Sequence, residues 1–485
     1  MLFNSLDFAI FLPIVFTLYW LVKQPKAQNL LLLIASYVFY GWWDWRFLSL
    51  IAFSSLVDYL VGLKLHEATN HSRRRVYLGI SLTVNLGLLI FFKYTNFFID
   101  SFTQAFTFFG HPITASHLNI ILPVGISFYT FQTLSYSIDI YRKKIAPTRD
   151  IIVFFAYVSF FPQLVAGPIE RASSLLPQFS KDRTFNYGLA VEGTRQILWG
   201  LFKKIVIADS CATYVNFIFD NSAQYSGTTL ILGAFLFAFQ IYGDFSGYSD
   251  IAIGTAKLFG FRLMQNFAFP YFSRDIAEFW RRWHISLSTW FRDYLYIPLG
   301  GSRGSNSMRI RNVFIIFIVS GFWHGANWTF IIWGVLHAVY FLPLLLLNKN
   351  RKNLGNISAG NQLPSFKEFI QMGLTFILTT FAWIFFRAES TYQALQYIKN
   401  IFTGLLKKSA YVDTLNIIYW KIGYQLPLFF LFFLIIEWSS RNQQFGIEKI
   451  ALNQPRLIRW GLYFFIALSI FFSQHTEQTF IYFQF

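Results

Sequence analysis

Residues 313–347 read VFIIFIVSGFWHGANWTFIIWGVLHAVYFLPLLLL, and this apolar stretch decides the class of fold. Its composition suits the hydrocarbon core of a lipid bilayer, yet His324 lies near its middle, between Trp323 and Gly325. An ionisable side chain at membrane depth costs roughly 3 kcal/mol on insertion scales, so it normally faces a protein interior or a wet cavity. His324 is therefore either a packing or membrane-surface residue, or part of a reaction that takes place inside the membrane.

The composition of the whole chain supports a membrane protein. Of 485 residues, 55% are hydrophobic and only 13% are charged, whereas a soluble protein of this length needs more charge to cover its surface. The net charge of +17 comes largely from basic residues in short loops between apolar runs. This pattern fits the positive-inside rule and attraction to anionic lipid headgroups, so we expect the lipid bilayer as a partner and no nucleic acid.

The apolar runs predict an all-α polytopic membrane protein with about 10 to 12 transmembrane helices plus re-entrant or interfacial helices. We interpret residues 1–485 as one integral membrane domain. The N-terminus lacks a basic start and a small-residue cleavage site, so it reads as a retained first transmembrane helix. Basic residues at 23–27, 64–75 and 142–150 place these loops in the cytoplasm and the N-terminus outside.

Three stretches do not read as simple spans, namely residues 192–209, 243–260 and 275–301. The third has an aromatic helical face with Arg281 and Arg282 interspersed. It is either an interfacial helix that binds headgroups or a re-entrant element that presents His284 to the protein's centre. In the second case its basic collar would attract an anionic acyl donor.

Six polar residues lie in awkward apolar surroundings: His284, His324, Asp244, Asp250, Asn327 and Gln132. The chain has no glycine-rich phosphate loop and no G-x-S-x-G elbow. The histidine spacing does not match the H-E-x-x-H zinc motif, and Cys211 is the single cysteine, so no metal site is expected. Histidine acid–base chemistry remains, in which the imidazole takes a proton from a hydroxyl that attacks a thioester or ester.

Two motifs carry a family resemblance. RRWHISLSTWFRDYLYIPLGG at 281–301 and SGFWHGANWTFIIWG at 320–334 resemble the signature of the membrane-bound O-acyltransferase (MBOAT) family, in the branch of bacterial alginate and peptidoglycan O-acetyltransferase membrane subunits. The resemblance extends along nearly the whole chain. It includes MLFNSLDFAIFLPIVF, LPVGISFYTFQTLSYSIDIYR, FFPQLVAGPIER, LFKKIVIAD, YGDFSGYSDIAIG and FIYFQF.

The resemblance implies a ring of membrane helices around a central tunnel, with a catalytic core at residues 118–347. His324 matches the family's general base and His284 its second functional position. It further implies acetyl-CoA as the acyl donor with no bound cofactor, and an extracytoplasmic acetyltransferase partner that completes transfer onto a polysaccharide at the bacterial cytoplasmic membrane. An alginate-like exopolysaccharide is favoured, while acetylated cellulose or another capsule, peptidoglycan O-acetylation and D-alanyl transfer to teichoic acid remain open.

Other residues are assigned supporting roles. We expect Trp323 and Trp328 to wall the site, and Asn327 and Gln132 to support the tunnel. For Asp244 and Asp250 we favour structural pairing, over bonding to the re-entrant arginines or tuning of a histidine pKa. The remaining histidines read as a packed or pore-lining residue (His337) and as loop or terminal residues (His111, His117, His475). The stretch 313–347 should form two helices, one ending near 320–321 and one starting at Asn327, with His324 at the break.

Two other classes of function compete with the enzyme. A transporter or flippase would use the same polar residues to line a pathway, although no internal repeat supports it. An inert scaffold would only recruit a soluble acetyltransferase. Replacement of His324 by Ala separates these functions, because only the enzyme loses activity at normal membrane abundance.

Overall fold

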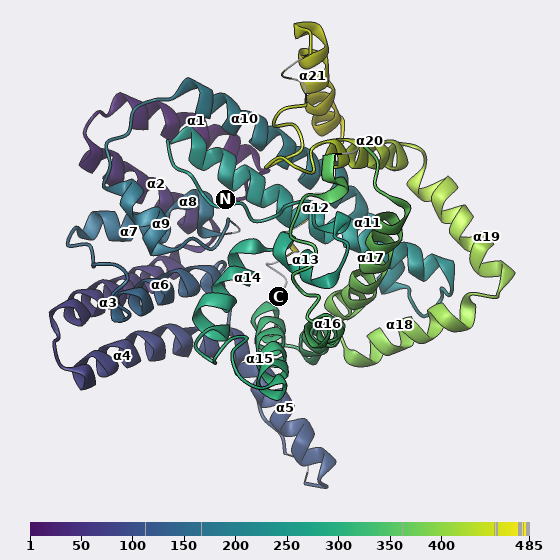
Figure 1. Ribbon diagram of the computed structural model, residues 1–485, viewed down its shortest axis with the longest axis horizontal. Helices are drawn as coiled ribbons and strands as arrows, with labels where there is room; N and C mark the ends of the chain where they lie inside the picture. Colours follow the sequence, from purple (N-terminus) through teal and green to yellow (C-terminus); the bar gives the residue numbers. More distant parts are fainter. Residues whose placement is uncertain are drawn as a thin grey trace. The chain divides into compact units, whose positions relative to one another are not determined.

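The computed structural model describes residues 1–485 except 112, 166, 361, 451, 453, 474–477, 479 and 482–485. Every regular element in the described part of the chain is helical (Figure 1). This confirms the all-α class. The chain forms two compact units, the first from Met1–Gly193 and Thr255–Met264, the second from Thr194–Gly254 and Gln265–Phe485. His475 lies outside the described residues.

The first unit is built from helices of the N-terminal third of the chain. They are α1 (Leu6–Leu21), α2 (Pro25–Asp44), η1 (Trp45–Phe47), α3 (Leu48–Glu67), α4 (His71–Leu89), η2 (Ile90–Tyr94), α5 (Thr95–Phe108), α6 (Ile126–Tyr141), α7 (Ile151–Ser159), α8 (Phe161–Leu164) and α9 (Ala172–Phe179). Two helices, α10 (Tyr187–Leu201) and α12 (Thr228–Leu258), have residues in both units.

The second unit contains the later helices. They are η3 (Phe202–Ala208), α11 (Asp209–Asp220), η4 (Pro270–Phe272), α13 (Ile276–Arg282), α14 (Ile285–Phe291), η5 (Arg292–Tyr296), α15 (Asn306–His324), α16 (Trp328–Leu346), η6 (Ile357–Gly360), α17 (Phe366–Arg387), α18 (Thr391–Gly404), α19 (Lys408–Asn416), η7 (Ile417–Ile422), α20 (Gln425–Ser439) and α21 (Arg456–Phe472).

Five helices in the described residues are long and apolar enough to cross a membrane. They are Trp45–Glu67, His71–Phe108, Thr228–Leu258, Trp328–Leu346 and Phe366–Arg387. A sixth span results if Lys408–Ile422 and Gln425–Ser439, which meet at 90°, count as one. The protein is therefore polytopic, but fewer helices meet these criteria than the apolar runs suggested. Some apolar helices are too short: α1 has 16 residues, which rise about 24 Å against a hydrocarbon core of about 30 Å. Others, such as α2 and α15 with 20 and 19 residues, are long enough but do not meet the criterion of apolar composition.

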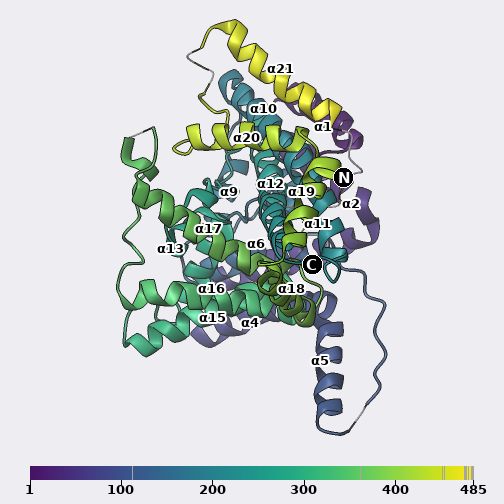
Figure 2. The same cartoon turned by 90° about the vertical axis from the view of Figure 1, so that its right-hand side faces the viewer.

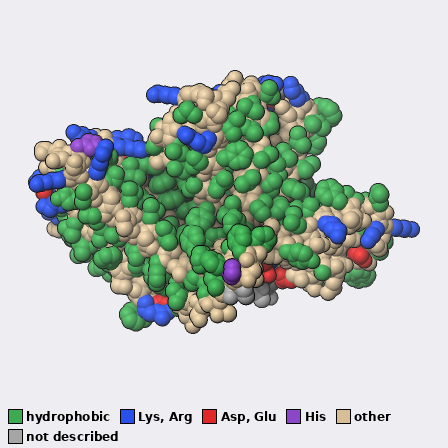
Figure 3. Space-filling model, turned by 90° about the horizontal axis from the view of Figure 1, so that it is seen from below, with side chains coloured by type: hydrophobic (Ala, Val, Ile, Leu, Met, Phe, Trp, Pro, Cys, Tyr) green, Lys and Arg blue, Asp and Glu red, His purple; other side chains and the backbone are tan. Residues whose placement is uncertain are grey.

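Apolar side chains are abundant on the surface as well as in the interior. Hydrophobic groups cover much of the face seen in Figure 3, while Lys and Arg lie mainly toward its edges. Ile10, Leu60 and Ile377 are each more than half exposed on their helices. Such a surface is suited to lipid rather than to water.

A buried carboxylate joins three helices of the first unit. Asp58 on α3 accepts hydrogen bonds from Asn85 Nδ2 on α4 at 2.7 Å, from Ser137 Oγ on α6 at 2.9 Å, and from Ser81 Oγ on α4. Asn85 Oδ1 in turn accepts from Ser54 and Thr133. Apolar surroundings offer no water to bond to the Asp58 carboxylate or the Asn85 amide oxygen. The internal donors take the place of water, and without them these buried polar groups would destabilise the bundle.

In the second unit, α15, α16 and α17 pack side by side (Figures 1 and 2). The α15–α16 contact is a backbone contact at two glycines. A Cβ on Gly321 would lie 2.2 Å from the carbonyl oxygen of Phe330, and a Cβ on Gly334 would lie 2.3 Å from that of Phe317. Glycine here permits close approach, as in the small-residue interfaces of membrane helices. Our expectation of a helix end near Gly321 was wrong, because this glycine serves the close contact with α16 and does not end the helix. α15 continues to His324.

Glycines have the same role in residues 243–260. Residues 243–258 form the second half of the 31-residue helix α12, and residues 259 and 260 lie in the turn that follows it. A Cβ on Gly243 would lie 2.9 Å from the carbonyl oxygen of Lys203, and one on Gly247 would lie 2.8 Å from that of Gly200. The glycines therefore bring α12 close to the backbone of α10 and η3, and this contact places Asp244 and Asp250 against the lysines of η3.

We predict that Gly334→Ala lowers the stability of the purified protein by about 1–3 kcal/mol, because the new methyl group forces α15 and α16 apart. Gly373→Ala on α17 is the matched control, since nothing lies within 4 Å of the position that its new methyl group would take. The control should be neutral or slightly stabilising. Thermal unfolding in detergent measures both, and equal melting temperatures for the two variants would contradict the backbone contact.

Candidate active site

His324 lies at the break between α15 and α16. It is the last residue of α15, and the extended backbone of Gly325 ends the helix. Asn327 then caps α16: its side-chain oxygen accepts from the N–H of Thr329 at 3.0 Å, and its Nδ2 donates to Glu389 O at 2.9 Å. The prediction that a second helix starts at Asn327 is confirmed, and Asn327 acts as a helix cap. His324 is only 2% exposed, so it faces the interior.

His284 comes from the 275–301 segment, which is not one helix. It separates α13 from α14 with φ of 43° and ψ of 56°, a left-handed conformation that is uncommon outside glycine. This turn directs the imidazole inward, where it is fully buried. Burial lowers the pKa of His284 to about 3, so the ring is neutral at physiological pH.

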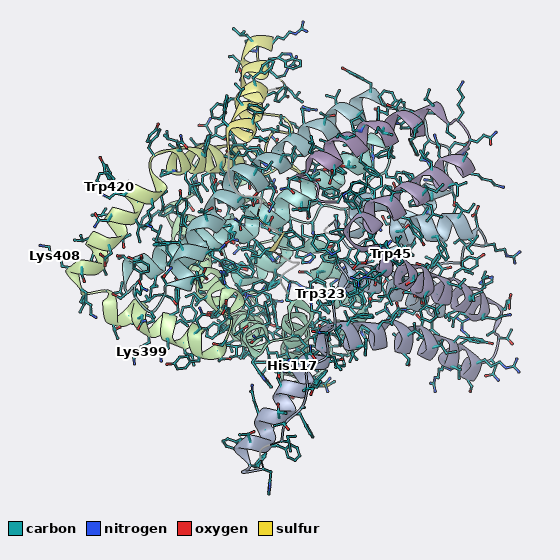
Figure 4. All side chains as sticks on the ribbon, turned by 180° about the vertical axis from the view of Figure 1, so that it is seen from behind. Trp45, His117, Trp323, Lys399, Lys408 and Trp420 are labelled. Carbon is teal, nitrogen blue, oxygen red and sulfur yellow. The ribbon has the colours of Figure 1, made fainter. Side chains whose placement is uncertain are left out.

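The structure brings the two histidines together. The imidazole centroids of His284 and His324 are 6.5 Å apart. The indole of Trp323 packs against both rings, with centroid distances of 5.9 Å to His284 and 4.9 Å to His324. Trp323 is buried in the second unit, in contrast to Trp420, which is 77% exposed and points away from the ribbon (Figure 4). The two predicted catalytic residues thus share one aromatic-walled interior.

The aromatic wall includes residues that sequence reasoning missed. Trp333 and Phe386 lie 5.1 Å and 5.3 Å from the His324 ring, centroid to centroid. Trp383 stacks on Trp333 at 5.6 Å. Trp328, which we expected to wall the site, is instead 51% exposed. The physical reason is its position as the first residue of α16, whereas Trp333 lies further along the helix, on its buried face.

His337 is a third buried histidine next to this wall. Its Nδ1 accepts a hydrogen bond from Trp280 Nε1 at 3.2 Å, and its ring packs against Trp333 at 4.8 Å. It therefore has the packing role that the sequence suggested, and it holds the Trp280 indole in place.

The predicted carboxylates are paired, but with lysines rather than with the re-entrant arginines. Lys203 Nζ lies 2.6 Å from Asp250 Oδ2. Lys204 Nζ lies 2.8 Å from both Asp244 Oδ1 and Asp209 Oδ1. All five side chains are buried. The sequence signal was available in LFKKIVIAD, because two lysines in an apolar run require buried anions.

The remaining predicted residues, Arg281, Arg282 and Gln132, bond to backbone oxygens or to a carboxylate. Arg281 donates to the backbone oxygens of Asn350 and Asn353, both at 2.9 Å. Arg282 forms an ion pair with Glu278 at 3.0 Å. Gln132 belongs to the first unit, where its amide donates to Tyr157 O at 2.7 Å. Each of these three side chains therefore has a structural partner of its own.

A cavity of about 530 Å³ lies in the second unit, and neither His284 nor His324 is among its lining residues. Its apolar walls include Trp280 and Phe317, and Ser320 lies one turn before His324 on α15. Three arginines also line it, Arg292, Arg309 and Arg351. The cavity thus combines an apolar interior, suited to an acyl chain or pantetheine-like arm, with cationic groups suited to phosphate.

Comparison with known proteins places the chain in a family. Residues 142–353 match the model of the MBOAT, membrane-bound O-acyltransferase, family. The chain is 40% identical to the "Probable alginate O-acetylase AlgI" of Pseudomonas aeruginosa over 95% of this chain and 86% of that protein. It is 34% identical to the "Peptidoglycan O-acetyltransferase" of Helicobacter pylori over 100% of this chain and 98% of that protein. It is 32% identical to the "Teichoic acid D-alanyltransferase" of Bacillus subtilis over 46% and 58%.

The chain therefore belongs to the membrane-bound O-acyltransferase family. It is a multi-pass membrane enzyme of the O-acyltransferase class, and the relatives named above are bacterial. Within the described residues, no three His, Cys, Asp or Glu side chains come together in a way that could hold a metal ion.

We predict that Lys204→Met destabilises the protein by about 3–5 kcal/mol, because it leaves Asp209 and Asp244 as buried carboxylates without their shared cation. Lys64→Met is the control: its ion pair with Glu67 is solvent-exposed, so the change should cost under about 1 kcal/mol. Thermal unfolding in detergent compares the two, and a Lys204→Met variant as stable as Lys64→Met would refute the proposed importance of the buried network.

Proposed function

We propose that this chain moves an acetyl group from cytoplasmic acetyl-CoA across the bacterial cytoplasmic membrane for O-acetylation of an extracytoplasmic polysaccharide, with His324 as the general base. The single observation that carries the proposal is the pair of buried imidazoles, 6.5 Å apart between centroids, inside a helical membrane protein of this family.

The chemistry requires only groups that this site offers. Neutral His324 takes the proton of the acceptor hydroxyl while the hydroxyl oxygen forms a bond to the thioester carbonyl carbon. The carbon–sulfur bond then breaks, and the departing thiolate receives the proton from His324. Trp323, Trp333 and Phe386 exclude water around the imidazole, which protects the thioester from hydrolysis.

The cavity supports an anionic thioester donor. Acetyl-CoA carries phosphates at one end and a thin pantetheine arm at the other, and the cavity has arginines together with apolar walls. Phosphate binds well to guanidinium groups because the geometry permits two parallel hydrogen bonds. Arg351 and Arg309 are therefore assigned to the phosphates, and the Trp280 side of the cavity to the arm.

The relatives support a proposal for the acceptor. Relatives named as alginate O-acetylases cover most of the chain at about 40% identity, which favours an alginate-like exopolysaccharide. An extracytoplasmic acetyltransferase partner would complete transfer onto the polymer. Peptidoglycan O-acetylation is the second candidate, favoured by the Helicobacter pylori relative that aligns along the whole chain. D-alanyl transfer has weaker support, because that relative matches less than half of the chain.

Replacement of His324 by Gln tests the proposal. We expect acetylation of the cell's polysaccharide to fall by about 10²- to 10⁴-fold, the usual contribution of a general base, at unchanged membrane abundance. His117→Gln is the control, because His117 is solvent-exposed in the first unit and pairs with Asp100. Full acetylation in His324→Gln would leave the inert-scaffold or transporter alternatives, and these two would then be separated by a substrate-transport assay on liposomes that contain the purified protein, because only a transporter moves substrate across the membrane.

The donor assignment has its own test. We predict that Arg351→Gln raises the KM for acetyl-CoA by about two- to fivefold, with kcat nearly unchanged, because it removes one partly solvated ion pair with phosphate. Arg303→Gln is the matched control, since Arg303 is exposed and does not line the cavity. A KM that is the same in both variants and insensitive to ionic strength would contradict phosphate binding here.

A further inference from the structure

We propose that Asn266 is a positioning residue that fixes the tautomer of His284, so that Nε2 of this histidine accepts a hydrogen bond from the substrate hydroxyl. The inference rests on the proposed function for its catalytic meaning, but the tautomer itself can be measured independently. Asn266 lies outside every motif that the sequence singled out, in the loop that follows α12.

Asn266 holds the segment 284–286 through both its backbone and its side chain. Its backbone oxygen accepts from the N–H of Ile285 at 2.9 Å. Its side-chain Oδ1 lies 3.0 Å from His284 Nδ1 and accepts from Ser286 N at 3.3 Å and Ser286 Oγ at 2.9 Å. Its Nδ2 donates to Ser249 Oγ on α12 at 3.1 Å. Asn266 and His284 are both fully buried.

These contacts determine which end of the amide faces the histidine. The backbone N–H of Ser286 is a donor only, so the atom that it meets must be the amide oxygen. A flipped amide would place its NH2 group against this backbone N–H, so that two donors would face each other, whereas the hydroxyls of Ser286 and Ser249 can adapt to either orientation. The atom 3.0 Å from His284 Nδ1 is therefore an acceptor.

The proton on the imidazole follows from this acceptor. Facing a carbonyl oxygen, Nδ1 of His284 must carry a hydrogen. Ser286 Oγ also approaches Nδ1 at 3.5 Å, but its one proton goes to Asn266, so it can only accept. The neutral ring then has its lone pair on Nε2, for which the described residues supply no hydrogen-bond partner.

The position of the lone pair limits what His284 can do in the reaction. A neutral imidazole with hydrogen on Nδ1 cannot polarise the thioester carbonyl through Nε2, because Nε2 has no proton to donate. It can accept a hydrogen bond from the acceptor hydroxyl and so hold that hydroxyl for His324, whose ring lies 6.5 Å away. Phe245, with its edge against the imidazole at 4.6 Å between centroids, keeps the ring from rotating.

The direct test is the tautomer. The full-length chain is labelled with ¹⁵N at its histidine rings, and the His284 signals are assigned by difference from His284→Gln. We expect the wild type to carry hydrogen on Nδ1, and Asn266→Ala to populate the Nε2–H form. Asn312→Ala is the matched control, because Asn312 is also fully buried in this unit but bonds to the oxygens of Leu299 and Gly301. Hydrogen on Nε2 in the wild type, or no change in Asn266→Ala, overturns the inference.

A second variant keeps the shape and changes the charge. Asn266→Asp retains the acceptor, so hydrogen stays on Nδ1, but a carboxylate favours the imidazolium and should raise the pKa of His284 by more than one unit. Among the described residues, the charged or titratable groups on the surrounding elements are His324, the pairs Lys204–Asp244, Lys203–Asp250 and Arg282–Glu278, and the hydrogen-bonded pair Tyr242–Glu437, which lines a small cavity together with Asn266. These are unchanged in the variant, so the shift reports the new carboxylate.

Acetyl transfer gives the functional readout. We expect kcat in Asn266→Ala to fall by about 100-fold with little change in KM, the usual effect of misplacing a catalytic group. In Asn266→Asp the acidic limb of the pH–rate profile should move to higher pH in step with the measured pKa, a shift that a purely structural residue would not produce. If the tautomer depends on Asn266 but His284→Gln retains full transfer, the assignment of the proton stands and the role of His284 in the proposed function fails.

Discussion

The site depends on one contact, the backbone of α15 against the backbone of α16 at Gly321 and Gly334. Because neither residue has a Cβ, the two helices approach more closely than side chains would allow. The short linker that reverses the chain then places His324 at the inner end of α15, and the Asn327 cap fixes the start of α16. The position of the imidazole is thus set by main-chain geometry, which is more rigid than a chain of side-chain contacts.

Polar side chains inside the second unit have two kinds of partner, opposite charges in one region and neutral groups in another. Near α12 the cations and anions are matched: Lys203 with Asp250, and Lys204 with Asp209 and Asp244. Around His284 and His337 the described polar partners are neutral, namely the amide of Asn266 and the indole of Trp280. Each buried charge is compensated by its partner, and loss of that partner would leave an unpaired charge in the core. The neutral partners leave both imidazoles uncharged, so Nε2 of His284 keeps a lone pair, whereas Nε2 of His337, whose Nδ1 accepts from Trp280, carries the proton. The ion pairs near α12 are suited to holding helices together, and the neutral surroundings of the histidines are suited to acid–base chemistry.

Much of the fold could be read from the sequence because lipid permits few structures. The apolar runs predicted helices throughout, and helices are found, but length could not be judged from composition alone. α1 is shorter than a bilayer's hydrocarbon core, and residues 243–258, with their glycines and carboxylates, proved to be part of a regular helix. For α12 the outcome depended on the neighbouring backbone of α10 and η3, about which a local pattern carries no information. Membrane topology and the single-domain interpretation stay predictions.

By itself the sequence determined the family, the all-helical class and the two histidines, because the motifs around His284 and His324 are long and specific, and because buried ionisable residues are rare in apolar chains. Only the tertiary structure decided what surrounds them. It replaced Trp328 by Trp333 and Trp383, gave the aspartates lysine partners, and placed Asn266 against His284. The physical reason is that side-chain partners are chosen by helix packing across tens or hundreds of residues, and hydrogen-bond direction depends on atoms that no sequence pattern records.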